Sequence, residues 1–208
     1  MSIKRIFTAL MLCVSVSGLF SCSSSEDEPL PDDTGDKVEN EGEKKTLIVY
    51  FSFTAGNTKS IAEKIHEEIG GDIERLETAI PYPDDYNAAV SQGQQEVSSG
   101  YKPELKPLSV NVKDYDRIIV GTPTWWYKMS PAVLSFLSST DFTGKTVVPF
   151  MTNSGWPGTV IKDMTTVAEG NGAKVENSHE FRFSSNAEHY DQMVTSQEEL
   201  TEWIESLK

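Results

Sequence analysis

Short apolar runs alternate with amphipathic stretches from residue 46 to the end of the chain. The apolar runs have the length of strands, whereas the stretches between them place apolar residues at helical spacing. This pattern predicts strands over residues 46–53, 72–77, 117–122, 146–152 and 174–183. Strand and helix in alternation predict an α/β fold, a parallel sheet of five strands with helices on both faces.

The predicted helices follow the strands and have recognisable ends. Glycine pairs or Gly-Asn-Gly end the first and fourth helices, and Ser130-Pro131 is a favourable start for the third. Ser196 and Glu199 predict a capping box at the start of the last helix. The second helix, capped by Asp84 or Asp85, is the least regular. Its expected apolar stripe contains glycine: Tyr86, Val90, Gly93 and Val97.

The first 21 residues have the charge and hydropathy of an export signal. Lys4 and Arg5 precede an apolar run that is too short to span a membrane as a permanent helix. Residues 19–22, LFSC, resemble a bacterial lipobox, which implies cleavage before Cys22 and acylation of that cysteine. The alternative is an ordinary secretion signal that is cut nearby.

Residues 22–45 predict a flexible acidic tether, because they contain few large apolar groups and much acid, proline and glycine. The acidic run after Cys22 resembles the surface-export signal of Bacteroidetes-type lipoproteins, which implies an anchor in the outer membrane. A solvated linker is the alternative. The only other cysteine, Cys13, lies in the predicted signal, so cysteine-ligated metals and disulfides within the mature chain are excluded.

Residues 46–208 have the length of one domain and a strong acidic excess. They contain 13 basic and 23 acidic residues, hence a net charge of −10. Nucleic acid is therefore excluded as a partner, because binding it requires clustered lysine and arginine. Basic proteins or small uncharged acceptors fit this charge better.

Three unusual loops follow the first, third and fourth predicted strands. Their sequences are SFTAGNTK at 52–59, GTPTWWYKMSP at 121–131 and TNSGWPG at 152–158. Parallel strands bring all three loops to one edge of the sheet, which is where α/β folds bind ligands. The first loop opens a helix, whose free N–H groups and dipole attract anions, and its polar side chains add donors. An ordinary capped helix start is the alternative, and no GxGxxG or GK[ST] motif is present.

Together with PYPDDYN, KPELK, DYDRIIVGTPTWW and FTGKTVVPF, these loops resemble the flavodoxin-like family, in its bacterial branch of flavodoxin-related oxidoreductases. The resemblance covers residues 46–208 and implies a three-layer fold with strand order 2-1-3-4-5 and FMN as cofactor. It also implies the residues that bind FMN. The phosphate would lie against Ser52, Thr54, Gly56, Asn57 and Thr58, and the ring against Pro123, Thr124, Trp125, Trp126, Tyr127, Thr152, Asn153, Ser154, Gly155 and Trp156.

Two residues depart from the family pattern. Ala55 is inserted in the phosphate loop and shifts Gly56 by one position, and Tyr127 stands where the family often has glycine. Tyrosine resists a positive φ angle, so redox tuning at this loop is expected to differ. Trp125 and Trp126 have a second interpretation as core residues, but two adjacent side chains cannot easily both point inward.

The sequence contains no convincing acid, base or nucleophile, and His66, His179 and His189 are expected to be structural or solvated. The first functional hypothesis is therefore an FMN redox protein in which the flavin performs the chemistry. It would serve a partner protein or a quinone-like acceptor, since nicotinamide nucleotides are scarce outside the cytoplasm. A signalling receiver is disfavoured because the required acidic residues are missing. A lipoprotein that keeps this fold for another ligand or a protein partner is the alternative.

Overall fold

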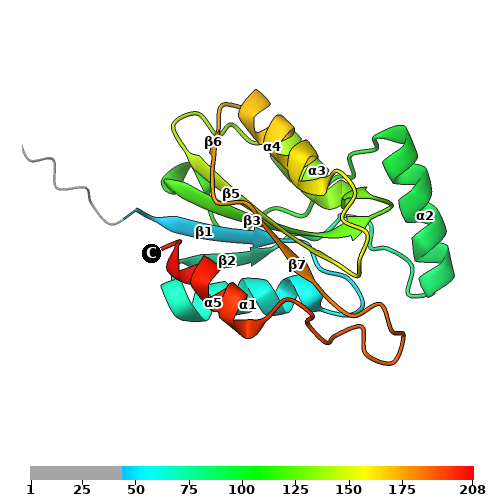
Figure 1. The fold of residues 1–208 in the computed structure, drawn as a ribbon. Helices are drawn as coiled ribbons and strands as arrows, with labels where there is room; N and C mark the ends of the chain where they lie inside the picture. Colours follow the sequence, from blue (N-terminus) through cyan, green and yellow to red (C-terminus); the bar gives the residue numbers. More distant parts are fainter. Residues whose placement is uncertain (1–43) are drawn as a thin grey trace, which may run out of the picture. The chain divides into compact units, whose positions relative to one another are not determined.

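The computed structural model describes residues 44–208 (Figure 1). The predicted signal segment, Cys22 and most of the predicted tether lie outside the described residues. No helix in the described part of the chain has the length and apolar character needed to cross a membrane.

The described residues form strands and helices in alternation. The strands are β1 (Thr46–Tyr50), β2 (Asp72–Arg75), β3 (Arg117–Trp125), β4 (Lys128–Met129), β5 (Thr146–Asn153), β6 (Lys174–Val175) and β7 (His179–Arg182). The α-helices are α1 (Asn57–Ile69), α2 (Tyr86–Ser99), α3 (Pro131–Ser139), α4 (Val160–Gly170) and α5 (Gln197–Glu205), with a short 3₁₀ helix at Val112–Asp114.

The sheet has the order β2-β1-β3-β5-β6 with parallel pairing throughout this path. Because β5 and β6 are the fourth and fifth of the predicted strands, the predicted order 2-1-3-4-5 is confirmed. Strand β7 also pairs with β5 in parallel, while β4 pairs with β3 in an antiparallel hairpin. The register is regular at the centre, where Ile48 of β1 lies between Ile73 and Ile119.

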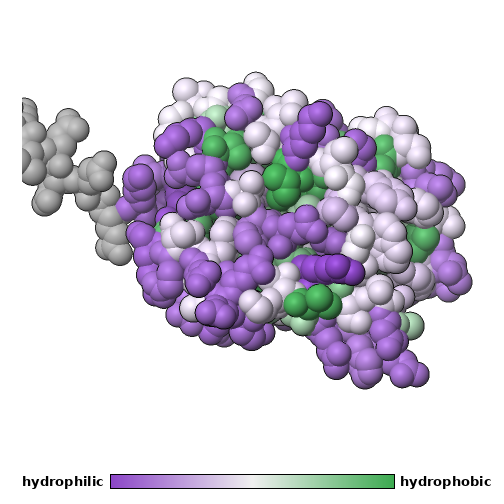
Figure 2. Space-filling view, viewed as in Figure 1, coloured by the Kyte–Doolittle hydropathy of each residue, from purple (hydrophilic) through white to green (hydrophobic). Residues whose placement is uncertain are grey.

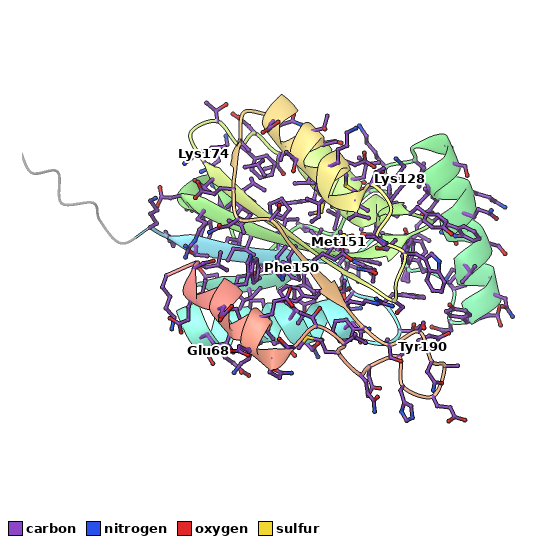
Figure 3. The ribbon with its side chains drawn as sticks, in the orientation of Figure 1. Glu68, Lys128, Phe150, Met151, Lys174 and Tyr190 are labelled. Atoms are coloured by element: carbon purple, nitrogen blue, oxygen red, sulfur yellow. The ribbon has the colours of Figure 1, made fainter. Side chains whose placement is uncertain are left out.

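Each face of the sheet has its own core, so the molecule has three layers. Met151 of β5 belongs to the cluster under α3 and α4, whereas its neighbour Phe150 belongs to the cluster under α1 and α5. The two side chains accordingly point to opposite faces (Figure 3). Gly121 of β3 is required beside Phe150, because a Cβ atom there would lie 2.1 Å from the phenyl ring. On the face shown in Figure 2, hydrophilic residues cover most of the surface and hydrophobic ones are scattered.

The fifth strand differs from its prediction, because residues 174–183 do not form one continuous strand. Residues 176–178 separate β6 from β7, and Asn177 has a positive φ of 51°. The Asn177 carbonyl oxygen accepts a hydrogen bond from the Trp203 indole at 2.8 Å. The Asn177 side chain donates to the carbonyl oxygen of Ser206. These contacts with the C-terminal helical segment draw the backbone out of the ladder.

Helix α2 also differs from its prediction. Asp85 caps it as expected, but its buried residues are Ala89, Gly93 and Glu96 rather than the stripe that starts at Tyr86. Tyr86 is 59% exposed. In Figure 1 the helix lies at the right-hand end of the sheet, beside the hairpin that extends β3. Where α2 meets this hairpin its inward residue is Gly93, which lies against the Trp125 ring.

Candidate functional site

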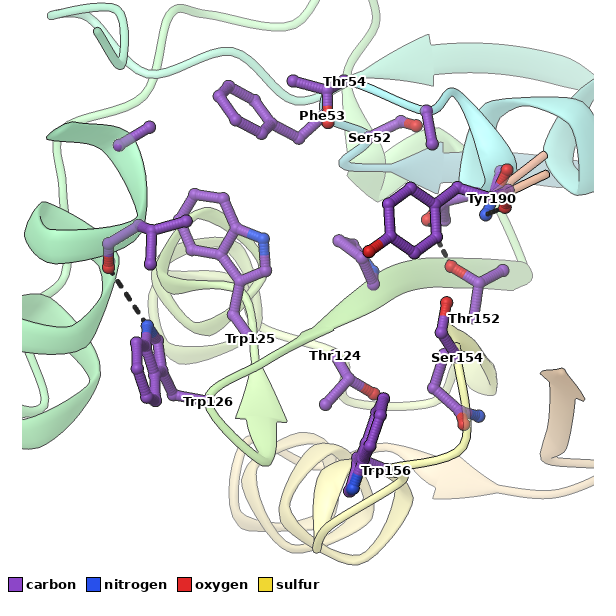
Figure 4. Close-up of a pocket in the computed structure, with 18 of the residues that line it drawn as sticks. Ser52, Phe53, Thr54, Thr124, Trp125, Trp126, Thr152, Ser154, Trp156 and Tyr190 are labelled. Carbon is purple, nitrogen blue, oxygen red and sulfur yellow. Dashed lines mark hydrogen bonds between the residues drawn. The ribbon is translucent and has the colours of Figure 1, made fainter. Parts of the chain in front are cut away.

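A cavity of about 490 Å³ opens at the carboxyl ends of the central strands (Figure 4). This volume lies within the range of small-molecule sites, which is roughly 300–1,000 Å³. The three predicted loops meet here. Fourteen of the fifteen predicted binding residues line the cavity: Ser52, Thr54, Gly56, Asn57, Thr58, Pro123, Thr124, Trp125, Trp126, Tyr127, Thr152, Asn153, Ser154 and Trp156.

The first loop leaves the start of α1 without a side-chain cap. Gly56 is the N-cap residue, with φ 76° and ψ 3°, and within residues 44–208 no side chain caps the first helical N–H groups. By contrast, Asp85, Ser130 and Ser196 cap α2, α3 and α5. The alternative of an ordinary capped helix start is therefore wrong. The open N–H groups form part of the cavity wall and are available to an anion.

The extra residue Ala55 is absorbed by a turn. The N–H of Gly56 donates to the carbonyl oxygen of Phe53 at 3.1 Å, and Thr54 and Ala55 form the exposed tip between them. Gly56 thereby reaches the left-handed conformation that a non-glycine residue adopts only at a cost. The insertion lengthens the loop and leaves the start of the helix intact.

Two of the predicted donors in this loop have partners within the protein. The hydroxyl groups of Thr58 and Thr152 are 2.8 Å apart, and both residues are buried. The Asn57 amide donates to the carbonyl oxygen of Tyr190 at 2.8 Å. These bonds fix the loop to β5 and to the segment that precedes α5. Backbone N–H groups and the Ser52 and Thr54 hydroxyl groups are then the groups in this loop that can face a ligand.

Trp125 is both a wall of the cavity and part of the packed interior, so both interpretations of the double tryptophan apply to it. Its ring lines the cavity and also packs edge-on against Phe51, Phe53 and Tyr82, with centroid distances of 5.5, 5.7 and 4.8 Å. Gly93 of α2 makes room for it, because a Cβ atom there would lie 3.2 Å from the indole. The cluster holds Trp125 as a rigid, flat wall.

Trp126 and Tyr127 form the turn of the hairpin between β3 and β4. Their φ angles are 49° and 65°, and Trp125 pairs with Lys128 across the turn. Two successive positive φ angles are the mark of a type I′ turn. Tyr127 therefore adopts a positive φ that tyrosine ordinarily resists. The tight hairpin imposes this conformation, and the N–H of Thr159 binds the Tyr127 carbonyl oxygen at 3.0 Å.

The third loop is held by Asn153. Its side chain accepts a hydrogen bond from the N–H of Gly155 at 2.7 Å and donates to Glu180 at 2.9 Å. Gly155 itself is exposed and does not line the cavity, and a Cβ atom there would lie 3.5 Å from Arg182. Trp156 and Thr124 both line the cavity (Figure 4). The Thr124 hydroxyl is buried without a hydrogen-bond partner, so a ligand in this cavity could supply one.

Sequence reasoning missed seven lining residues: Phe53, Ala55, Tyr86, Ala89, Val90, Gly93 and Tyr190. Glycine at position 93 of a helix was the available signal for α2, since it marks a close approach by another group. For Tyr190 no local signal exists. Its carbonyl oxygen accepts a hydrogen bond from Asn57, 133 residues away in sequence.

All 21 lining residues are uncharged. Around them, Arg75 donates to the carbonyl oxygen of Ser52 at 3.0 Å, and Lys59 pairs with Glu63. Burial, followed by a hydrogen bond to Glu96, raises the pKa of Tyr82, which keeps this phenol protonated behind Trp125. The cavity can therefore bind a phosphate through neutral donors and a flat ring through aromatic walls.

Within residues 44–208 no group of three or more acidic, cysteine or histidine side chains is arranged to hold a metal ion. None of the three histidines lines the cavity. His66 and His189 are exposed, and His179 packs between Phe181 and Trp203 with its Nε2 atom 3.2 Å from Glu199. The lining offers binding groups without an evident acid–base pair.

A three-layer α/β fold with an uncapped helix start and an aromatic cavity at one sheet edge defines a class of phosphate- and ring-binding proteins. Residues 45–207 match the family described as flavodoxin, so this chain belongs to the flavodoxin family. No curated protein matches the chain.

Several solved structures are similar to this chain. A candidate flavoprotein from Bacteroides uniformis is 28% identical, with a TM-score of 0.62, and the match covers 78% of this chain and 98% of that chain. A second, from Bacteroides eggerthii, is 26% identical with the same TM-score and covers 79% and 98%. A flavoprotein from Lactobacillus acidophilus, solved in complex with FMN, is 24% identical with a TM-score of 0.58 and covers 66% and 93%.

Proposed function

We propose that this protein binds FMN in the described cavity and acts as an electron carrier or a small flavin oxidoreductase. The observation that carries the proposal is the uncapped start of α1, which opens into a cavity without charged lining residues. A phosphate dianion is the group that such a helix start attracts. Membership of the flavodoxin family and the FMN complex of the similar Lactobacillus flavoprotein support this assignment.

Different residues of the cavity would hold the phosphate and the ring of FMN. The N–H groups after Gly56, with the Ser52 and Thr54 hydroxyl groups, would hold the phosphate. Trp125 would form a flat wall for the ring, and the Thr124 hydroxyl would gain a polar partner. The bound flavin supplies the redox chemistry, since it accepts and releases one or two electrons. The protein's own part is to bind the flavin, orient it and shield it from water.

The proposed location of the protein is the cell envelope, reached through a lipid anchor. Cys22 would be acylated after cleavage of residues 1–21, and the domain would lie at the cell envelope, with the outer membrane as the favoured site. Its partner would be a redox protein or a quinone-like acceptor, which fits the net charge of −10 and an uncharged cavity. Accumulation of an uncleaved precursor only when globomycin is present, and loss of this dependence on globomycin in Cys22→Ser, would support the anchor.

The decisive experiment is a flavin titration of residues 23–208. The purified protein is expected to show flavin absorbance, and the apoprotein is expected to bind FMN more tightly than riboflavin. Thr54→Ala should weaken FMN binding more than riboflavin binding, because its hydroxyl faces the cavity beside the helix start. A colourless protein that ignores both flavins would reject the proposal and favour a lipoprotein that keeps this fold for another ligand.

A further inference from the structure

Residues 183–196, between β7 and α5, form an ordered projection from the domain that reaches the cavity. Phe183 and Met193 pair as an isolated antiparallel bridge at its base. Above this base, the N–H of Ser184 donates to Gln192 at 2.8 Å, and the N–H of Gln192 donates to His189 at 3.0 Å. A segment with internal hydrogen bonds at its base and along its length holds its side chains in defined positions.

Tyr190 is the residue of this projection that lines the cavity. Its carbonyl oxygen accepts the 2.8 Å hydrogen bond from the Asn57 side chain, and Asn57 is the first residue of α1. Asn57 was expected to contact the phosphate. In the structure its side-chain amide bonds to the backbone of Tyr190, which leaves the Asn57 main-chain N–H for the phosphate.

The side chain of Tyr190 points into the cavity (Figure 4). Tyr190 is 46% exposed, and no other aromatic ring of the described residues stacks on it. The phenols of Tyr82 and Tyr115 are bonded to Glu96 and Asp72, whereas the Tyr190 hydroxyl has no hydrogen-bond partner within the described chain. A fixed backbone therefore presents a free ring and a free neutral donor to whatever fills the cavity.

We propose that Tyr190 is a ligand-binding residue of this cavity, positioned by Asn57, and that its phenol covers the phosphate-bearing arm of the ligand. This inference rests on the proposed binding of FMN. The phenol adds apolar contact area and a neutral donor in a cavity that lacks charged residues. Its main effect is to slow the release of FMN, because a covering side chain must move before the arm can leave.

The test compares Tyr190 with a tyrosine outside the cavity. Tyr101 is 52% exposed and does not line the cavity, so Tyr101→Ala is the matched control. Stopped-flow release of FMN is expected to be about tenfold faster in Tyr190→Ala and about threefold faster in Tyr190→Phe, with Tyr101→Ala within about twofold of wild type. Riboflavin release should change less than FMN release, because riboflavin lacks the phosphate.

The positioning role of Asn57 is tested in the same assay. Asn57→Ala keeps a good helix former at the start of α1 and removes the bond to the Tyr190 carbonyl oxygen. Release of FMN is expected to accelerate, and the double variant Asn57→Ala/Tyr190→Ala is expected to be no faster than Tyr190→Ala alone. Fully multiplicative effects of the two changes would overturn the positioning role.

The failures can be told apart. Wild type that binds no flavin rejects the proposed function, and the role of Tyr190 falls with it. Wild type that binds FMN while Tyr190→Ala releases it at an unchanged rate rejects only the role of Tyr190. Equal acceleration for FMN and riboflavin rejects the assignment to the phosphate arm. Circular dichroism establishes folding, and Tyr190→Leu decides the question if the alanine variant unfolds.

Discussion

The hydroxyl oxygens of Thr58 and Thr152 lie 2.8 Å apart and join the first turn of α1 to the end of β5. Both residues are almost fully buried. Thr58→Val removes one partner and leaves the Thr152 hydroxyl buried without a bond. We expect the free energy of unfolding in urea to fall by about 1–3 kcal/mol.

The double variant Thr58→Val/Thr152→Val is expected to lose less than the sum of the two single changes, because no buried hydroxyl is then left alone. Thr201→Val is the control, since Thr201 is exposed on α5 and its hydroxyl bonds within that helix. Additive losses would contradict a direct bond between the two threonines.

The positive φ angle of Tyr127 predicts that glycine is a more stable replacement than alanine at this position. At φ 65° glycine is unstrained, whereas the Cβ atom of alanine is strained against the backbone. Tyr127→Gly should therefore be more stable than Tyr127→Ala by about 1 kcal/mol, measured by chemical denaturation. At Lys128, which lies in an extended strand, the order should reverse. A more stable alanine variant at 127 would show that this turn relaxes.

Gly158 is predicted to be intolerant of any side chain. A Cβ atom there would lie 2.0 Å from the Tyr127 carbonyl oxygen, and the φ of Gly158 is 60°. Gly158→Ala should cost more than about 3 kcal/mol, because both the clash and the φ angle act against it. Gly170→Ala is the matched control. Its site is open and lies at the end of α4, so we expect a gain of about 0.5 kcal/mol or no change.

Tyr115 predicts a loss of stability at high pH. Burial, together with a 2.5 Å hydrogen bond to Asp72, raises the pKa of Tyr115 from 10.0 to about 12. Because the folded pKa is the higher one, the contribution of Tyr115 is complete below pH 10 and is lost as the pH rises towards 12.

Urea unfolding at pH 9 and pH 11 should therefore show a smaller fall for Tyr115→Phe than for wild type. The phenylalanine variant keeps the buried ring but has no proton to lose. Parallel curves for the two proteins would contradict the assignment to Tyr115.

Several parts of this fold could be predicted because local chemistry decides them. Asp85, Ser130 and Ser196 cap the helices that follow them, as their hydrogen bonds show. The alternation of strand and helix predicts the parallel sheet, whereas its strand order is what the resemblance to the flavodoxin-like family implies, and the structure has that order. The three loops at one edge follow from the same parallel arrangement.

Other parts depend on contacts that no local pattern encodes. The break between β6 and β7 depends on the hydrogen bond between Asn177 and Trp203. The contribution of α2 to the cavity wall depends on the packing of Trp125 over Gly93. The left-handed turn at Tyr127 is imposed by strand pairing against the preference of the residue itself. Tyr190 lies at the cavity beside Asn57, which is 133 residues away in sequence and donates a hydrogen bond to its carbonyl oxygen.

The direction of β1 has a practical consequence for work with this domain. Thr46 begins β1 at the sheet edge opposite the cavity, and Leu207 approaches the same edge, where its carbonyl oxygen binds Arg117. Fusion partners or coupling groups joined close to Thr46 or Leu207 therefore attach on the side of the domain opposite the cavity. An electrode or bead that carries the domain by these ends leaves the mouth of the cavity facing solution, open to cofactor and to a docking protein.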